Sequence, residues 1–254
     1  MTWSRLLRAE LRKLTTTKMP LAFFAVLVVI SGLTATAVIA GTDFDGSKGF
    51  ISTSADQRSL MAFAANATMG ASLFGAMAVA REYSHGTVIP TFLASPRRHR
   101  AMLAQYGAVA IVAALLGLLG ALLTVAAVAL ALPTTDYGFL VSAADVSRVC
   151  AASAFAGAIG GLLGAGIGAI VRNTGGAVAG AFFTLMVAPP LLVQMANDMG
   201  SWVPSTLVNV LSGVEAEVPA ADQVGIVAAI AALLAWALVP AAIGLLAVQR
   251  RDVA

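Results

Sequence analysis

The amino-acid sequence predicts an all-α integral membrane protein with six transmembrane helices, and three observations lead to this fold class. Of the 254 residues, 59% are hydrophobic and only 11% are charged, whereas soluble domains carry about 25% charged residues. The apolar residues gather in runs of roughly 20, the length that a helix needs to cross the hydrocarbon core. The basic residues lie mostly in alternate connecting segments. A chain this apolar could not cover its surface in water, so its solvent is lipid.

Residues 3–18 predict an amphipathic helix ahead of the first span. One face carries apolar side chains at helical spacing, namely Trp3, Leu6, Leu7, Leu11 and Leu14. Much of the remaining surface is basic, with Arg5, Arg8, Arg12, Lys13 and Lys18. Such a helix is suited to lying in the membrane interface, and the alternative is a solvated helix docked on protein. The basic stretch and the apolar run after it are both too long for a cleaved signal peptide.

The whole chain, 1–254, is expected to form a single transmembrane domain. The six spans are expected at about 20–40, 59–80, 102–132, 149–171, 175–197 and 223–248. Pro20 opens the first span, and Pro189 with Pro190 interrupts the fifth. Only three residues separate spans four and five, so these spans form an antiparallel hairpin, with Asn173 or Thr174 placed to cap the second helix.

Glycines four residues apart mark faces where helices can approach closely. In span four the pairs are 157/161, 160/164 and 164/168, and span five has Gly176 and Gly180. Small residues at this spacing let helix backbones approach where lipid gives no hydrophobic drive between helices. We expect packing within one subunit, with a dimer face as the alternative. The single cysteine, Cys150, is expected to be an apolar packing residue, with a redox role as the alternative.

The distribution of basic residues predicts the orientation. With the N-terminus inside, the inner segments hold twelve of the fifteen lysines and arginines, and the outer segments hold only Lys48, Arg58 and Arg148. The positive-inside rule therefore places both ends of the chain in the cytoplasm. An odd number of spans would break this separation, so the charge pattern supports the count of six as well.

The sequence shows no catalytic or metal-binding constellation, so we expect no enzymatic activity. His85 and His99 have no cluster of cysteines or carboxylates around them. The dipeptide Gly-Lys is absent, so the chain has no phosphate-binding loop of the Gly-x-x-x-x-Gly-Lys type. Spans two to six have no ionisable side chains away from their ends, whereas ion-coupled carriers usually need them. A transport protein of this kind would draw its energy from another chain.

The segment 81–100 is the place where such a chain could connect. It begins with Arg81 and Glu82 directly after span two, and it ends in a basic cluster after Pro96. Between these points lies a short apolar piece, 91–93. The pattern is typical of a short cytosolic helix that lies across the membrane. The alternative is an ordinary basic inner loop, which the positive-inside rule alone would explain.

Five stretches of the sequence resemble the permease subunits of ABC-2 type ATP-binding-cassette exporters, especially the short actinobacterial kind. They are residues 9–23, 80–105, 164–180, 202–213 and 249–252. The first resembles the elbow helix of that family, and the second resembles its first cytosolic loop. The third is similar to the turn between spans four and five, and the last is similar to the basic tail. The fourth departs in one place, since Val203 stands where the family usually has leucine.

The resemblance implies roles for particular segments. Residues 3–18 would be the elbow helix, and residues 82–96, within the segment 81–100, would be the coupling helix that docks on an ATPase. The implied coupling residues are Arg81, Glu82, Tyr83, His85, Gly86, Thr87, Pro90, Thr91, Phe92, Leu93, Pro96 and Arg97. Glu82 would pair with a basic residue of the elbow helix or of the partner. Residues 198–222 would hold a re-entrant extracellular helix pair.

The resemblance also implies a function and partners. The chain would be the permease subunit of an exporter in the bacterial plasma membrane, with a second, identical or homologous permease and two ATPase subunits that bind ATP and Mg²⁺. No cofactor is expected on this chain, and no nucleic acid. The substrate would be hydrophobic or amphiphilic, such as a drug, a lipid or a peptide antibiotic, and its pathway would run between spans two and five. Candidate lining residues are Asn66, Thr68, Met69, Ser72, Phe182, Phe183 and Met186.

Two other functions fit the same residues. A secondary transporter or channel that works alone would transport without nucleotide and would be expected to carry a buried charge in its spans. A membrane scaffold that does not transport would bind or regulate an ATPase without coupling hydrolysis to flux.

Overall fold

The computed structural model describes residues 3–41, 51–87, 98–135, 137–195, 197–214 and 224–250. These residues are helical apart from short connections, and no strand occurs among them. Six helical segments are long and apolar enough to cross a membrane. The predicted fold class, an all-helical multi-pass membrane protein with six spans, is therefore confirmed at this level.

The helices agree closely with the expected spans. In chain order they are α1 (Trp3–Thr16), α2 (Met19–Ala40), α3 (Ser54–Ala64), α4 (Thr68–Ser84), α6 (Arg98–Ala131), α7 (Ala143–Val171), α8 (Thr174–Phe182), α9 (Ala188–Met195), α10 (Pro204–Ser212) and α11 (Ile226–Arg250). Shorter turns are η1 (Leu132–Thr134), the π-helical turn η2 (Phe183–Val187) and η3 (Asn197–Trp202). The expected re-entrant segment 198–222 thus holds most of η3 and all of α10, and its residues 215–222 lie outside the described part of the chain.

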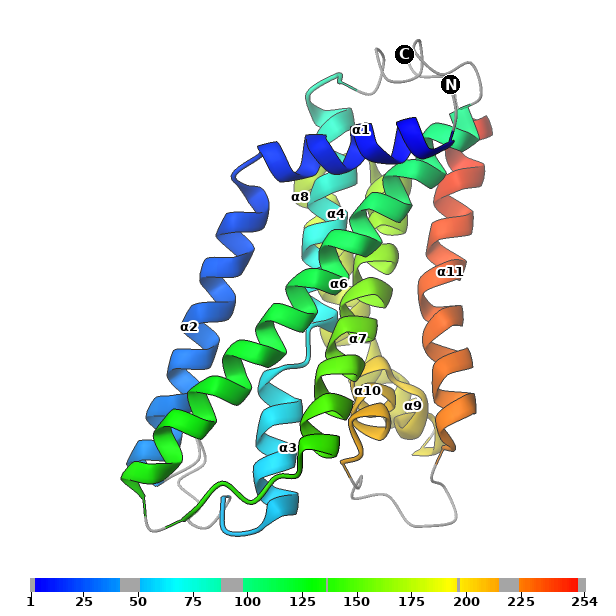
Figure 1. Ribbon diagram of the computed structural model, residues 1–254. Coiled ribbons are helices and arrows are strands. Elements are labelled where there is room, and N and C mark those ends of the chain that lie inside the picture. The colour runs from blue at the N-terminus through cyan, green and yellow to red at the C-terminus, as the bar shows by residue number, and fades with distance from the viewer. Residues whose placement is uncertain are drawn as a thin grey trace.

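Helix α7 lies at the centre of the bundle, and α4, α6 and α11 pack around it (Figure 1). Helices α2 and α11 and the span from α8 to α9 lie at the periphery and expose most of their apolar side chains. Such exposure is expected where the surrounding solvent is lipid rather than water.

The glycine faces of α7 pack inside this one chain. A Cβ atom added at Gly160 or Gly164 would collide with the backbone carbonyl of Thr68 or Ser72 in α4. One added at Gly157 would collide in the same way with Ala113 in α6. These contacts agree with the expected packing within one subunit and with the rule that small residues bring helix backbones together in membranes.

Span two is not one continuous helix, contrary to the expected segment 59–80. Helix α3 ends at Ala64, and α4 begins at Thr68. The amide oxygen of Asn66 accepts a hydrogen bond from the backbone N–H of Thr68 at 3.2 Å. A short polar side chain that binds its own backbone in this way competes with the helical hydrogen bonds, so the helix stops and restarts here.

Span five changes its winding just before Pro189 and Pro190. In the turn η2, the backbone N–H of Ala188 donates to the carbonyl of Phe183, five residues earlier. Prolines have no N–H to give to the carbonyls of the preceding turn, and a π-helical turn accommodates the irregular ladder. The interruption that the two prolines predicted is therefore a single wider, π-helical turn of the backbone. The α-helix then continues through the prolines as α9.

Helix α1 runs across one end of the bundle, where α11 also ends (Figure 1). We call this the terminal end. The end of α4, the start of α6 and the turn between α7 and α8 lie at the same end, whereas η1, the start of α7 and α10 lie toward the opposite end. An even number of spans gives this arrangement, because both termini then emerge on one side.

Candidate functional site

The terminal end gathers the segments that the sequence marked as functional. Helix α1 docks on the bundle through Leu14, which is buried in an apolar cluster with Phe74 and Met102. Leu7 and Leu11 pack against the same cluster. One face of the amphipathic helix is thus docked on protein, while Trp3 and the arginines of α1 stay exposed. An interfacial position of this helix stays a prediction.

A three-residue ion cluster fastens α1 to the end of α4. The Nζ atom of Lys13 lies 2.7 Å from Oε1 of Glu82 and 3.0 Å from Oε2 of Glu10. Both carboxylates are largely buried, with Glu82 8% exposed and Glu10 7% exposed, and Gln105 of α6 lies against Glu82. Of the two expected partners for Glu82, the structure selects the one in the N-terminal helix.

The electrostatics of this cluster favour a charged lysine. Burial by itself would lower the pKa of Lys13, but the charge and hydrogen bond of Glu82, followed by those of Glu10, outweigh it. The pKa of Lys13 is therefore raised above its ordinary value of 10.5. A lysine held between two carboxylates keeps its positive charge at neutral pH, and this charge favours the ion pair between α1 and α4.

A second set of contacts ties the end of α4 to the turn between α7 and α8. The guanidinium carbon of Arg172 lies 5.3 Å from the centroid of the Tyr83 ring, a cation–π distance. Arg172 also donates to the carbonyl of Ala247 in α11 at 3.2 Å. The hydroxyls of Ser84 and Thr174 lie 3.1 Å apart. These contacts join the end of α4 and the turn between α7 and α8 to α11.

The connection between α7 and α8 has the capping that its sequence predicted. Arg172 ends α7 in the left-handed conformation, with φ at 58°. The side chain of Asn173 then accepts a hydrogen bond from the backbone N–H of Gly176 at 3.0 Å, and this caps α8. The tight turn places Arg172 and Thr174 on either side of the end of α4, which explains why these residues contact Tyr83 and Ser84.

A cavity of about 300 Å³ opens between α1 and α4 at the ion cluster. Its wall includes residues from both helices and from the residues that follow α4, namely Lys13, Leu14, Arg81, Glu82, His85 and Thr87. Polar and charged groups of both signs line it. Four of the predicted coupling residues, Arg81, Glu82, His85 and Thr87, thus border a recess in the terminal end.

The predicted coupling residues divide between described and undescribed parts of the chain. Glu82 is buried and Tyr83 is half-buried, while Arg81, His85, Gly86 and Thr87 are exposed. His85 Nδ1 lies 2.9 Å from the carbonyl of Arg81, and Gly86 has a positive φ of 68°, so the chain turns sharply after α4. The remaining predicted residues lie outside the described residues, namely Pro90, Thr91, Phe92, Leu93, Pro96 and Arg97.

The predicted pathway residues lie in different surroundings within the described part of the chain. Thr68 and Ser72 are buried against the glycine face of α7, and Met69 is half-buried. Phe182, Phe183 and Met186 lie on the outer face of span five, with 47%, 53% and 49% of their surface exposed. Asn66 lines a cavity that contains no residue of α8, η2 or α9. A pathway between spans two and five stays a prediction.

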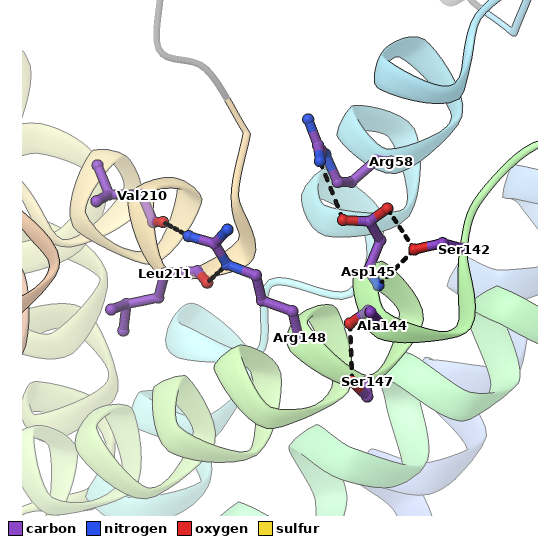
Figure 2. Close-up of polar contacts among 8 residues, drawn as sticks. All are labelled: Arg58, Ser142, Ala144, Asp145, Ser147, Arg148, Val210 and Leu211. Atoms are coloured by element: carbon purple, nitrogen blue, oxygen red, sulfur yellow. Dashed lines mark hydrogen bonds and ion pairs between the residues drawn. The ribbon is translucent and has the colours of Figure 1, made fainter.

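Two further sets of polar contacts lie toward the opposite end of the bundle (Figure 2). Arg58 of α3 donates to Asp145 of α7 at 3.1 Å, and Asp145 also accepts from the hydroxyl of Ser142 at 2.7 Å. Arg148 reaches the last turn of α10, donating to the carbonyls of Leu211 at 2.8 Å and Val210 at 3.1 Å. A cation at a helix C-terminus satisfies carbonyls that have no helical partner. Arg148 thus links the start of α7 to the end of α10.

Sequence reasoning missed Glu10, Lys13 and Gln105 as members of the cluster at the terminal end. One signal was available, because Glu10 lies three residues after Leu7 and four before Leu14 and therefore interrupts the apolar face of α1. A charged residue on the face that docks needs a partner of opposite charge. A search of models of known protein families and of curated proteins gives no match to this chain.

Proposed function

We propose that the chain is the membrane-spanning permease subunit of an ATP-driven exporter, with ATP hydrolysed by a separate ATPase that docks at the terminal end. The observation that carries the proposal is the Lys13 bridge between Glu10 and Glu82. It couples α1 to the end of α4 at the start of the segment 81–100, which the sequence marks as the docking element.

The packing supports a route by which a movement at the terminal end would reach the membrane interior. Helix α4 contacts α7 along most of its length, through backbone-to-glycine contacts at Gly160, Gly164 and Gly168. Arg172 and Thr174 tie the same end of α4 to α8 and α11. Displacement of the end of α4 would therefore move α7 and α8 with it, because close-packed elements transmit displacement rather than absorb it.

The substrate class follows from the sequence rather than from a bound ligand. The expected pathway residues, from Asn66 to Ser72 and from Phe182 to Met186, are uncharged. Together with a partner ATPase and a second permease, this chain would form half of a pathway for a hydrophobic or amphiphilic molecule. The excess of basic residues at the terminal end supports a cytoplasmic location for that end.

The test compares two ion pairs at opposite ends of the same bundle. The chain is co-expressed with its candidate ATPase, and hydrolysis stimulated by hydrophobic compounds is measured in the purified complex. Glu82→Gln breaks the tie between α1 and α4, and Asp145→Asn breaks the Arg58–Asp145 pair at the other end as the matched control. We expect Glu82→Gln to lose most of the stimulation and Asp145→Asn to keep it. Equal stimulation in both variants would contradict the coupling role, provided that both complexes assemble and unfold at similar temperatures.

A further inference from the structure

The break in span two lies deep in the membrane. Helix α3 has 11 residues and rises about 1.5 Å per residue, so the break at Ala65–Ala67 lies about 16 Å from the start of the span, roughly halfway across a hydrocarbon core of about 30 Å. Figure 1 shows α3 and α4 meeting midway along the bundle. Non-helical backbone at this depth is tolerated only where it is buried in protein or lines a cavity.

A cavity of about 240 Å³ lies at this break, between α2, α6 and the junction of α3 with α4. Its wall is mainly aliphatic, and none of the described residues that line it is charged. Gly70, Gly117 and Gly120 contribute to the wall, and a Cβ atom added at Gly70 would meet nothing within 4 Å. Val26 and Ile30 of α2 belong both to the cavity wall and to the exposed outer surface of the bundle, so the cavity borders the surrounding lipid.

The Asn66 side chain in the cavity wall carries a hydrogen-bond donor group with no partner among the described residues. The amide oxygen of Asn66 is engaged by the N–H of Thr68, which leaves its amide NH₂ group without a hydrogen-bond partner in the part of the chain that the structure describes. The other two polar side chains of the wall, Ser31 and Thr124, pair with each other at 3.3 Å. The Asn66 NH₂ group is therefore available to donate, so a ligand that brought an acceptor oxygen to it would gain a hydrogen bond.

We propose that this cavity binds one uncharged hydrophobic molecule that carries a hydrogen-bond-accepting oxygen and arrives from the bilayer. The absence of charge in the described wall selects an uncharged molecule, because a charge at this depth would have no counter-ion. The volume admits a compact body of one or two rings, since it is slightly smaller than the range typical of drug-sized sites. The accepting oxygen is selected by Asn66. The site faces α2 and α6 and shares Asn66 with the predicted pathway between spans two and five, and occupation of the site does not depend on an ATPase.

Benzophenone is a suitable probe because it is compact and uncharged, has one carbonyl acceptor, and attaches covalently to nearby C–H groups under light. The intact chain is purified in lipid nanodiscs, labelled at increasing probe concentration, and mapped by mass spectrometry. We expect saturable labelling on α2, on α6 and around the α3–α4 junction. Labelling that never saturates, or that is spread over all lipid-facing helices, would overturn the proposal. This outcome needs only the native chain.

Two glycine variants test whether the cavity itself is the site. A Cβ atom at Gly70 meets nothing within 4 Å, so Gly70→Leu can place its side chain in the cavity without a clash at Cβ. Gly32 of α2 has the same open surroundings but does not line the cavity, so Gly32→Leu is the matched control. We expect Gly70→Leu to reduce saturable labelling by about tenfold or more and Gly32→Leu to leave it unchanged. Equal labelling of both variants would contradict the assignment.

The role of Asn66 is tested with a pair of ligands that differ only at the acceptor. Diphenylmethane has the shape of benzophenone without its carbonyl, and it is used as a competitor. We expect Asn66→Ala to weaken benzophenone binding by roughly fivefold, the usual worth of one hydrogen bond, and to leave competition by diphenylmethane unchanged. A parallel loss for both ligands would show that Asn66 acts only through the shape of the break, and no loss for either would remove it from the site.

Discussion

The ion pair of Lys13 shows how the partner of one residue can depend on the arrangement of whole helices. The sequence predicted that Glu82 pairs with a cation, but left open whether the cation lies in the N-terminal helix or in a partner. The choice depends on the angle at which α1 crosses α4, and that angle follows from packing between residues that are far apart in the chain. Buried Gln57 is a similar case, because it donates to the carbonyls of Ile51 and Gly138 and nothing in its neighbouring sequence predicts these partners.

Replacing Lys13 should loosen α1 much more than replacing its neighbour. Lys13→Met leaves Glu10 and Glu82 buried without a cation, so we expect the free energy of unfolding to fall by about 1–3 kcal/mol. Arg12→Met removes the same charge from an exposed position of α1, and we expect a change within about 0.5 kcal/mol. Unfolding in detergent measures both variants. Equal effects would mean that the ion cluster contributes no more than a surface charge.

The raised pKa of Lys13 predicts how this difference depends on pH. A group whose pKa is higher in the folded protein stabilises the fold below its unfolded value, here near 10.5, and loses that contribution as the pH rises through the folded value. The stability gap between the native chain and Lys13→Met should therefore be constant from pH 7 to 9. It should shrink as the pH rises above 10.5. A gap that shrank near neutral pH would show that Lys13 is not the group responsible.

At the scale of helices, most elements could be predicted because each one has a simple sequence pattern, such as an apolar run or a capping residue. The lengths of the apolar runs predicted the six spans, and the capping residues at 173–174 predicted the start of α8. The break in span two could not be predicted in this way, since hydropathy reports composition and 59–80 is apolar throughout apart from a few small polar residues. The break arises from one hydrogen bond of Asn66. The packing of α7 on α4 was predicted only as a glycine face, because glycine spacing does not say which helix it meets.

The contact between α4 and α7 should tolerate no added methyl group. In Gly164→Ala the new Cβ would overlap the backbone carbonyl of Ser72, and backbone cannot move aside as a flexible side chain can. We expect a loss of about 1–3 kcal/mol or more. Gly70→Ala adds the same methyl group to α4 where nothing lies within 4 Å, so it should be neutral or slightly stabilising through helix propensity. Thermal unfolding compares the two, and a tolerated Gly164→Ala would contradict the described packing.

At the scale of the whole molecule, the basic residues gather at the terminal end, and this predicts its cytoplasmic location. The prediction can be checked by labelling single cysteines with a maleimide that does not cross membranes. Cys150 is the only native cysteine and is buried, so Cys150→Ala gives the background. We expect Tyr137→Cys, at the opposite end, to react in intact cells, and Thr16→Cys, in α1, to react only after the cells are opened. The reverse result would place the terminal end outside.

The functional account rests on one further property of the whole molecule, which is that the terminal end receives an ATPase. The most direct measurement is affinity purification of the tagged chain from membranes in which its candidate ATPase is co-expressed, followed by mass measurement of the intact complex. The account predicts a complex with two ATPase subunits and two permease subunits that hydrolyses ATP. A chain that purifies without any ATPase under conditions that keep its six helices folded would contradict it.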